Sequence, residues 1–143
     1  VLLPAIEAGA RKAGRSRKDL TIVGSVFVIT GRNDAETREM REFVRAQVAF
    51  YGSTPSYRRV WSLHGWETIG EELSALAARG RWEEMPRQVS DEILEAFAII
   101  APPEAVWERL QAVYEGLLDR VILYRPFQLQ DRDLWERILS ARR

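Results

Sequence analysis

The chain has 143 residues, and its content of 46% hydrophobic and 29% charged residues is typical of a folded globular domain. Its 21 basic residues balance its 21 acidic residues, so the composition lacks the positive charge that attracts nucleic acids or anionic membrane surfaces. The absence of cysteine excludes disulfides, thiol nucleophiles and cysteine-bound metals.

The chain starts at Val1, without an initiator methionine or the features of a signal peptide. No apolar run approaches the roughly 20 residues that span a bilayer. We therefore expect a cytoplasmic segment of a longer polypeptide, with neither nucleic acid nor membrane as a partner. Residues 2–13 predict a helix, and Gly14 suits the position after its end.

The clearest strand is predicted at residues 20–30, where the run is β-branched and almost wholly apolar. Because apolar and polar residues do not alternate there, we expect both faces to be buried, as in a parallel sheet. Gly24 within the run indicates a bulge or a close packing contact.

A long helix is predicted at residues 34–51, preceded by Asn33, which with Glu36 resembles a capping box. The sequence from Gly52 to Pro55 breaks this helix. Three shorter helices should follow, at residues 56–63, 67–79 and 92–97. Residues 82–86 should connect the second of these helices to the third.

The last third of the chain contains a short apolar run at residues 97–100, a helix at 103–117, a strand at 120–124 and a helix at 131–141. The order predicts a single helix-rich α/β unit with two parallel strands. Both strands look buried on two faces and so need neighbouring strands. Other copies of the chain or further sequence would supply them, and we expect a homo-oligomer.

Polar and aromatic residues gather where the long helix breaks, namely Tyr51, Ser53, Thr54 and Tyr57. They could line a substrate pocket, or they could form a capping turn with tyrosines wedged between helices. His64, the only histidine, is the weak candidate for proton transfer, because its ordinary pKa lies near neutrality. It has no carboxylate partner in a local motif, and it falls at a helix end.

The sequence contains no metal-ligand cluster, no glycine-rich phosphate loop and no serine nucleophile elbow. Trp61, Trp66 and Trp82 crowd one region and predict a satellite core, a cleft or a subunit interface.

Five segments together carry a resemblance over essentially the whole chain: LLPAIEAGARKAGRS, VGSVFVITGRNDAE, FYGSTPSYRRVWSLHGW, GRWEEMPRQVSDEILEAF and DRVILYRPF. In this order they resemble the C-terminal part of luciferase-like flavin- or F420-dependent oxidoreductases. One departure is the sequence Ala101, Pro102, Pro103, where that family usually has a Gly-Thr-Pro-like turn.

The resemblance implies a fragment of a (β/α)8 TIM barrel that binds FMN or F420. Residues 20–30 would be the seventh strand, 34–101 a helical insertion, 120–124 the eighth strand and 131–141 the closing helix.

Active sites of such barrels lie at the C-terminal ends of the strands. The resemblance therefore makes Thr30 and Arg32 candidate cofactor contacts and Arg125 a candidate substrate contact, with the alternative that all three are ordinary loop residues. The parent protein would be an oxidoreductase or monooxygenase that acts on a small organic molecule, and this chain alone would be inactive. The alternative is a non-catalytic helical module for protein interaction or oligomerisation.

Overall fold

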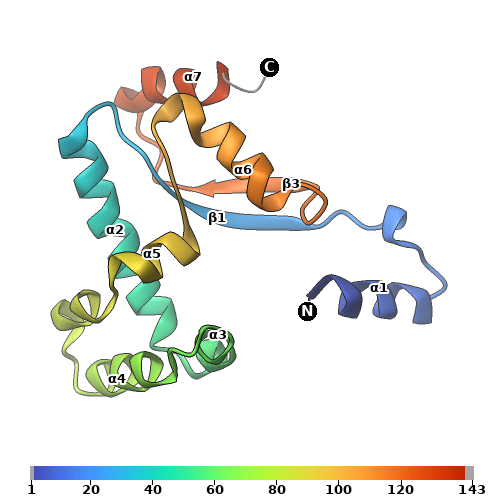
Figure 1. The fold of residues 1–143 in the computed structure, drawn as a ribbon, viewed down its shortest axis with the longest axis horizontal. Coiled ribbons are helices and arrows are strands. Elements are labelled where there is room, and N and C mark those ends of the chain that lie inside the picture. The colour runs from blue at the N-terminus through green and yellow to red at the C-terminus, as the bar shows by residue number, and fades with distance from the viewer. Residues whose placement is uncertain (1, 141–143) are drawn as a thin grey trace.

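The computed structural model describes residues 2–140, which form helices around a small sheet (Figure 1). The helices are α1 (Leu2–Lys12), α2 (Asp34–Gly52), α3 (Arg58–His64), α4 (Glu67–Ala78), α5 (Asp91–Phe97), α6 (Val106–Tyr114) and α7 (Arg132–Ser140). The strands are β1 (Val23–Ile29), β2 (Ala98–Ile100) and β3 (Arg120–Tyr124).

Every helix expected from the sequence is present, with differences at the ends. A 3-10 turn, Pro55–Tyr57, precedes α3, and the expected connector is a 3-10 helix, Trp82–Gln88. The helix expected at 103–117 begins as a 3-10 turn and ends at Tyr114, because Gly116 takes the left-handed conformation with φ +75°. Residue 141 of the last expected helix lies outside the described residues.

The prediction of two strands is wrong, because the described residues form three. Residues 98–100, which we placed within a helical insertion, are strand β2 and pair in parallel with β1 from Phe27 to Ile29. Strand β3 pairs in parallel with the other side of β1, so the order is β2-β1-β3. A three-residue run is too short for its sequence to show strand periodicity, and its pairing with β1 defines it.

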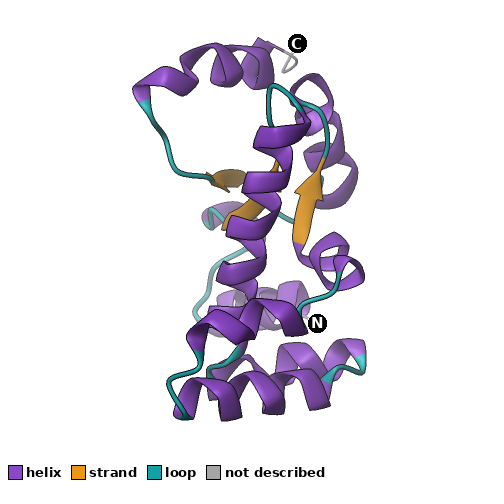
Figure 2. Ribbon diagram, turned by 90° about the vertical axis from the view of Figure 1, so that its left-hand side faces the viewer, coloured by secondary structure: helices purple, strands orange, loops and turns teal. Residues whose placement is uncertain are grey.

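This strand order places helices on both faces of the sheet. The chain moves from β1 to β2 through α2–α5, and then returns across β1 to β3 through α6. Since parallel connections are right-handed, two connections that run in opposite directions carry their helices on opposite faces. Figure 1 shows α6 and α7 on one side of the sheet and α2 and α5 on the other, and Figure 2 shows helices above and below the short strands.

Two hydrophobic clusters fill the space between the sheet and these helices. On the α6–α7 side, Val26 and Val28 of β1 join a cluster that includes Leu110 and Leu134. On the α2 side, Ile29 belongs to a second cluster with Val44 of α2 and its neighbours. The described residues thus form an open sheet with two layers of helix, whereas in a (β/α)8 barrel the helices form one outer ring.

Burial along the strands is uneven. The C-terminal half of β1 is buried except for the half-buried Phe27, and β1 has the neighbours on both sides that we expected. The expectation that other copies or further sequence supply these neighbours is wrong for β1, because β2 and β3 belong to this chain. The expectation of burial on both faces is wrong for β3, whose Ile122 is 58% exposed, and for the start of β1, where Val23 is 49% exposed. Nothing within residues 2–140 covers this part of the sheet. Gly24 forms no bulge; it packs against Leu118, because a Cβ there would lie 2.5 Å from a Leu118 methyl carbon.

Candidate functional site

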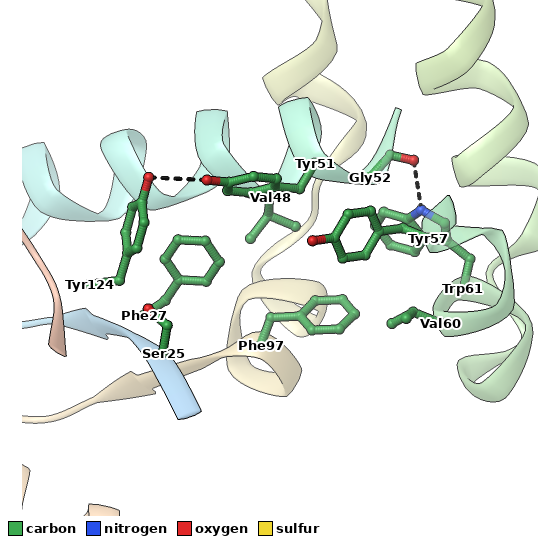
Figure 3. Close-up of a pocket in the computed structure, with 10 residues that line it drawn as sticks. All are labelled: Ser25, Phe27, Val48, Tyr51, Gly52, Tyr57, Val60, Trp61, Phe97 and Tyr124. Atoms are coloured by element: carbon green, nitrogen blue, oxygen red, sulfur yellow. Dashed lines mark hydrogen bonds between the residues drawn. The ribbon is translucent and has the colours of Figure 1, made fainter. Parts of the chain in front are cut away.

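An aromatic cavity of about 400 Å³ lies between the sheet and the helices α2, α3 and α5 (Figure 3). Its lining comes from segments far apart in the chain, namely Ser25, Phe27, Val48, Tyr51, Gly52, Tyr57, Val60, Trp61, Phe97 and Tyr124. Ring side chains dominate these walls, so the cavity suits a flat apolar group.

One wall of the cavity is fixed by Trp61, which is 2% exposed. Its indole lies between two glycines: a Cβ at Gly52 would be 2.2 Å from one ring carbon, and a Cβ at Gly70 would be 2.5 Å from another. The indole Nε1 also donates a 2.9 Å hydrogen bond to the Gly52 carbonyl. The break after α2 and the turn of α4 therefore hold this ring in one place.

A row of hydroxyl groups crosses the opposite end of the cavity. The hydroxyls of Tyr51 and Tyr124 are 3.2 Å apart (Figure 3). The Tyr124 hydroxyl also donates to Oε1 of Gln47 at 3.2 Å. Phe27 supports Tyr124 edge-on, with ring centroids 4.9 Å apart. The hydrogen bond with Tyr124 raises the pKa of Tyr51.

A second, polar cleft of about 340 Å³ lies at the C-terminal ends of β1 and β3. Arg32 is held there by carboxylates, with nitrogen–oxygen distances of 2.8 Å to Glu36, 3.2 Å to Asp133 and 3.5 Å to Asp131. These contacts satisfy the guanidinium of Arg32 from within the chain.

Arg125 reaches across the same cleft, and its Nη1 donates to the Thr30 carbonyl at 2.8 Å. Burial lowers the pKa of the Arg125 guanidinium. The buried Nε of Arg125 has no hydrogen-bond partner among the described residues, and neither has the buried Oγ1 of Thr30, which does not line the cleft. Such atoms commonly mark a place where water or a ligand binds.

The structure therefore divides the predicted site residues into groups. Arg32 and Arg125 line the polar cleft, while Thr30 is fully buried and contacts Arg125 only through its backbone carbonyl. Tyr51 and Tyr57 meet at the aromatic cavity. The structure does not bring these two groups together into one constellation.

Ser53 and Thr54 instead bond the backbone of the turn, with their hydroxyls donating to the carbonyls of Phe50 and Tyr51 at 2.8 and 2.7 Å. His64 is exposed and stacks on Trp66, with ring centroids 4.7 Å apart, and it does not line either cavity.

Sequence reasoning missed Tyr124, Phe27 and Phe97 in the lining of the aromatic cavity. It also missed Gln47, which accepts the hydrogen bond of Tyr124. Tyr124 could have been identified, because it ends the predicted strand 120–124 at the C-terminal edge where barrel active sites lie. Gln47 and Phe97 lie on helix faces whose neighbours depend on the fold, so no local signal marks them.

Two further features constrain the site. Within residues 2–140, no group of three or more His, Cys, Asp or Glu side chains could hold a metal ion. No helix in the described part of the chain is long and apolar enough to cross a membrane.

Comparison with known proteins identifies the relatives of this chain. A protein of Mycobacterium tuberculosis (strain ATCC 25618 / H37Rv) without a functional name is 40% identical over 122 residues, which cover 85% of this chain and 36% of the relative. A 5,10-methylenetetrahydromethanopterin reductase of Archaeoglobus fulgidus is 30% identical over 127 residues, which cover 85% of this chain and 37% of that protein. A reductase of the same name from Methanopyrus kandleri is 23% identical over 127 residues, covering 88% of this chain and 35% of its own length.

The chain thus spans about a third of the length of these relatives. The family described as luciferase-like monooxygenase matches residues 1–120, which is most of the chain. Together with the relatives, this match shows that the chain belongs to the luciferase-like monooxygenase family.

Proposed function

We propose that the chain is the C-terminal part of an oxidoreductase that acts on a small organic substrate with F420 or FMN. The aromatic cavity carries this proposal, because it offers a ring-lined space of about 400 Å³ next to the sheet. The family match and the relatives named as reductases support the reaction class. In such an enzyme the cofactor supplies the redox step, and the protein binds and orients the reactants.

The described residues do not fit the phosphate-bearing tail that F420 and FMN share. In the polar cleft, Arg32 is already paired, and the lining includes the carboxylates of Glu36, Glu39 and Asp131 against two arginines. This charge disfavours an added anion. We therefore assign the aromatic cavity to the substrate, and we expect residues outside this chain to hold the cofactor phosphate.

Thr30 and Arg125 keep a narrower role in this proposal. The buried Nε of Arg125 has no partner within residues 2–140, so we assign it to a neutral polar group at the edge of the reacting molecules. The carbonyl of Thr30 holds the Arg125 guanidinium in place. Arg32 then acts by holding the loop after β1 to residues 131 and 133.

A pair of variants on α3 tests the cavity assignment in the whole protein. Val60 lines the cavity, whereas Leu63 on the same helix is 64% exposed and lies outside it. Val60→Trp should fill the cavity and raise KM for the organic substrate about tenfold or more, the loss of roughly 1.4 kcal/mol of binding. Leu63→Trp should leave KM unchanged, and equal KM values for the two variants would contradict the assignment.

The 143-residue chain alone should be inactive. Absorbance spectra of F420 and of FMN should not change when the purified chain is added, while the whole protein should oxidise or reduce one of them in the presence of substrate. Tight cofactor binding and turnover by the chain alone would contradict the first expectation. Failure of the whole protein with both cofactors would contradict the proposed reaction.

We further propose a homo-oligomer in which a second copy covers the open part of the sheet around Val23 and Ile122. The same open face of the sheet supports the alternative function, in which the chain is a non-catalytic module for protein interaction or oligomerisation. Light scattering after size exclusion of the 143-residue chain should show a species larger than a monomer, and the Ile122→Arg variant of this chain should be a monomer. Leu129→Arg, at a position that is 88% exposed, is the matched control.

A further inference from the structure

The direction of the hydrogen bonds at the end of the aromatic cavity is set by Gln47. The contact runs from the Tyr124 hydroxyl to the carbonyl oxygen of Gln47, and a carbonyl only accepts. Tyr124 has a single hydroxyl hydrogen, and that contact uses it. In the 3.2 Å contact between the two phenols, Tyr51 must therefore be the donor.

Tyr51 consequently faces the cavity as an acceptor. Its only hydroxyl hydrogen points to Tyr124, while its oxygen keeps lone-pair capacity and receives no hydrogen bond from the described residues. The hydroxyl of Tyr57, the third phenol in the lining, has no hydrogen bond within residues 2–140 and can rotate to donate or accept. In the Gln47–Tyr124–Tyr51 row, the donor and the acceptor of each hydrogen bond are thus fixed.

The apolar walls define the rest of the ligand. Phe27 lies 6.3 Å from Tyr51 and 4.9 Å from Tyr124, measured between ring centroids, so a ring lies beside both of these half-buried phenols. A bound group therefore meets aromatic surfaces on its sides and one acceptor at its end.

We propose that the Gln47–Tyr124–Tyr51 row makes this cavity selective for flat apolar ligands that carry a hydroxyl or N–H donor. The three residues determine specificity, and none of them is assigned a step in the reaction. The inference deepens the proposed function, since it names the substrate class of the same cavity.

Two probes that differ only in the donor test the selectivity: 2-naphthol and its methyl ether, 2-methoxynaphthalene. Calorimetric titration of the whole protein should show 2-naphthol binding about 3- to 10-fold more tightly, the range expected for one hydrogen bond. In Tyr51→Phe the two probes should bind with equal affinity, whereas Tyr57→Phe should keep the preference for 2-naphthol. Binding of neither probe, or a ratio unchanged by Tyr51→Phe, would overturn the inference.

Two substitutions of Gln47 test the direction of the row. Gln47→Glu keeps an acceptor, so the preference for 2-naphthol should remain. Gln47→Lys offers only donors, which turns the hydrogen of Tyr124 towards Tyr51 and frees the hydrogen of Tyr51 for the cavity. The affinity for 2-naphthol divided by that for 2-methoxynaphthalene should then fall by about tenfold. Equal ratios in the two variants would contradict a row oriented by Gln47.

These titrations need neither cofactor nor turnover. If the selectivity is found but no redox reaction occurs with F420 or FMN, the proposed function fails and the inference about the cavity stands. If the reaction occurs and the ratio is absent, the inference alone fails.

Discussion

Trp61 is held between Gly52 and Gly70, and it connects the end of α2 with α3 and α4. Both glycines have ordinary backbone angles, so their value lies in the missing side chain and not in conformational freedom. The indole is buried and hydrogen-bonded, which leaves it little room to move. A side chain added at either glycine must therefore displace a rigid ring from the core.

Gly52→Ala should lower the free energy of unfolding by about 1–3 kcal/mol, the usual cost of overpacking a core. Urea unfolding followed by circular dichroism measures the change. Gly9→Ala is the matched control, because nothing lies within 4 Å of a Cβ there and alanine favours the helix by about 1 kcal/mol. A Gly52→Ala variant as stable as the unmodified protein would show that Trp61 moves freely.

Asp119 joins the start of β3 to the segment before β1. Its carboxylate accepts hydrogen bonds from the Ile22 amide at 2.6 Å and from Arg17 at 2.9 Å. The bond from the Ile22 amide, followed by the bond from Arg17, lowers the pKa of Asp119. Because the folded-state pKa lies below the unfolded value, the resulting stability is present above the unfolded pKa and is lost as pH falls through the folded pKa.

Asp119→Asn should therefore be less stable than the unmodified protein at neutral pH, and the difference should shrink below about pH 4, where aspartate begins to protonate. Urea unfolding at a series of pH values between neutrality and acid gives both curves. Parallel curves over this range would contradict a stabilising role for the ionised carboxylate.

At the scale of elements, the sequence predicts helix ends better than strands. Gly14 takes φ +67° after α1, and Asn33 Oδ1 accepts from the Glu36 amide at 3.0 Å, as the local residue types indicate. The Glu36 carboxylate differs from a standard capping box, because it accepts from the Arg32 amide, one residue earlier than expected. Helix ends are predictable because the residues that form hydrogen bonds with the free backbone groups of a helix end are near in sequence.

Asn33→Ala should lower the free energy of unfolding by about 1 kcal/mol, the typical cost of losing a helix cap. The loss should be visible in urea unfolding monitored by circular dichroism. Asn33→Ser keeps an oxygen that can accept from the same amide, so it should retain most of the stability. Equal losses in the two variants would show that the cap contributes little and that packing defines the start of α2.

At the scale of the whole molecule, the sequence predicts the parallel β1–β3 pair but not the third strand or the strand order. Strand order depends on contacts between segments about 70 to 100 residues apart, such as Phe27 with Ala98 and Ser25 with Ile122. The cavity could not be predicted for the same reason, because its walls come from β1, from β3 and from three helices. Periodicity within a segment contains no information on which neighbour the segment will meet.

The strand order can be tested by disulfide trapping, since the chain has no cysteine that would compete. Ser25 and Ile122 are paired neighbours on β1 and β3, and both are exposed, so Ser25→Cys with Ile122→Cys should cross-link under mild oxidation. Ile99 and Leu123 lie on the two outer strands, separated by β1. Two strand spacings amount to about 9 to 10 Å, which is beyond the reach of a disulfide.

Ile99→Cys with Leu123→Cys should therefore stay reduced in the 143-residue chain, as judged by mass spectrometry and non-reducing electrophoresis. If β1, β2 and β3 were three successive strands of a (β/α)8 barrel, β2 would lie between the other two, so β2 and β3 would be adjacent and the second pair would cross-link. The two pairs applied to the whole protein would thus separate the open order from a barrel order. Cross-linking of the second pair in the isolated chain would contradict the order β2-β1-β3 itself.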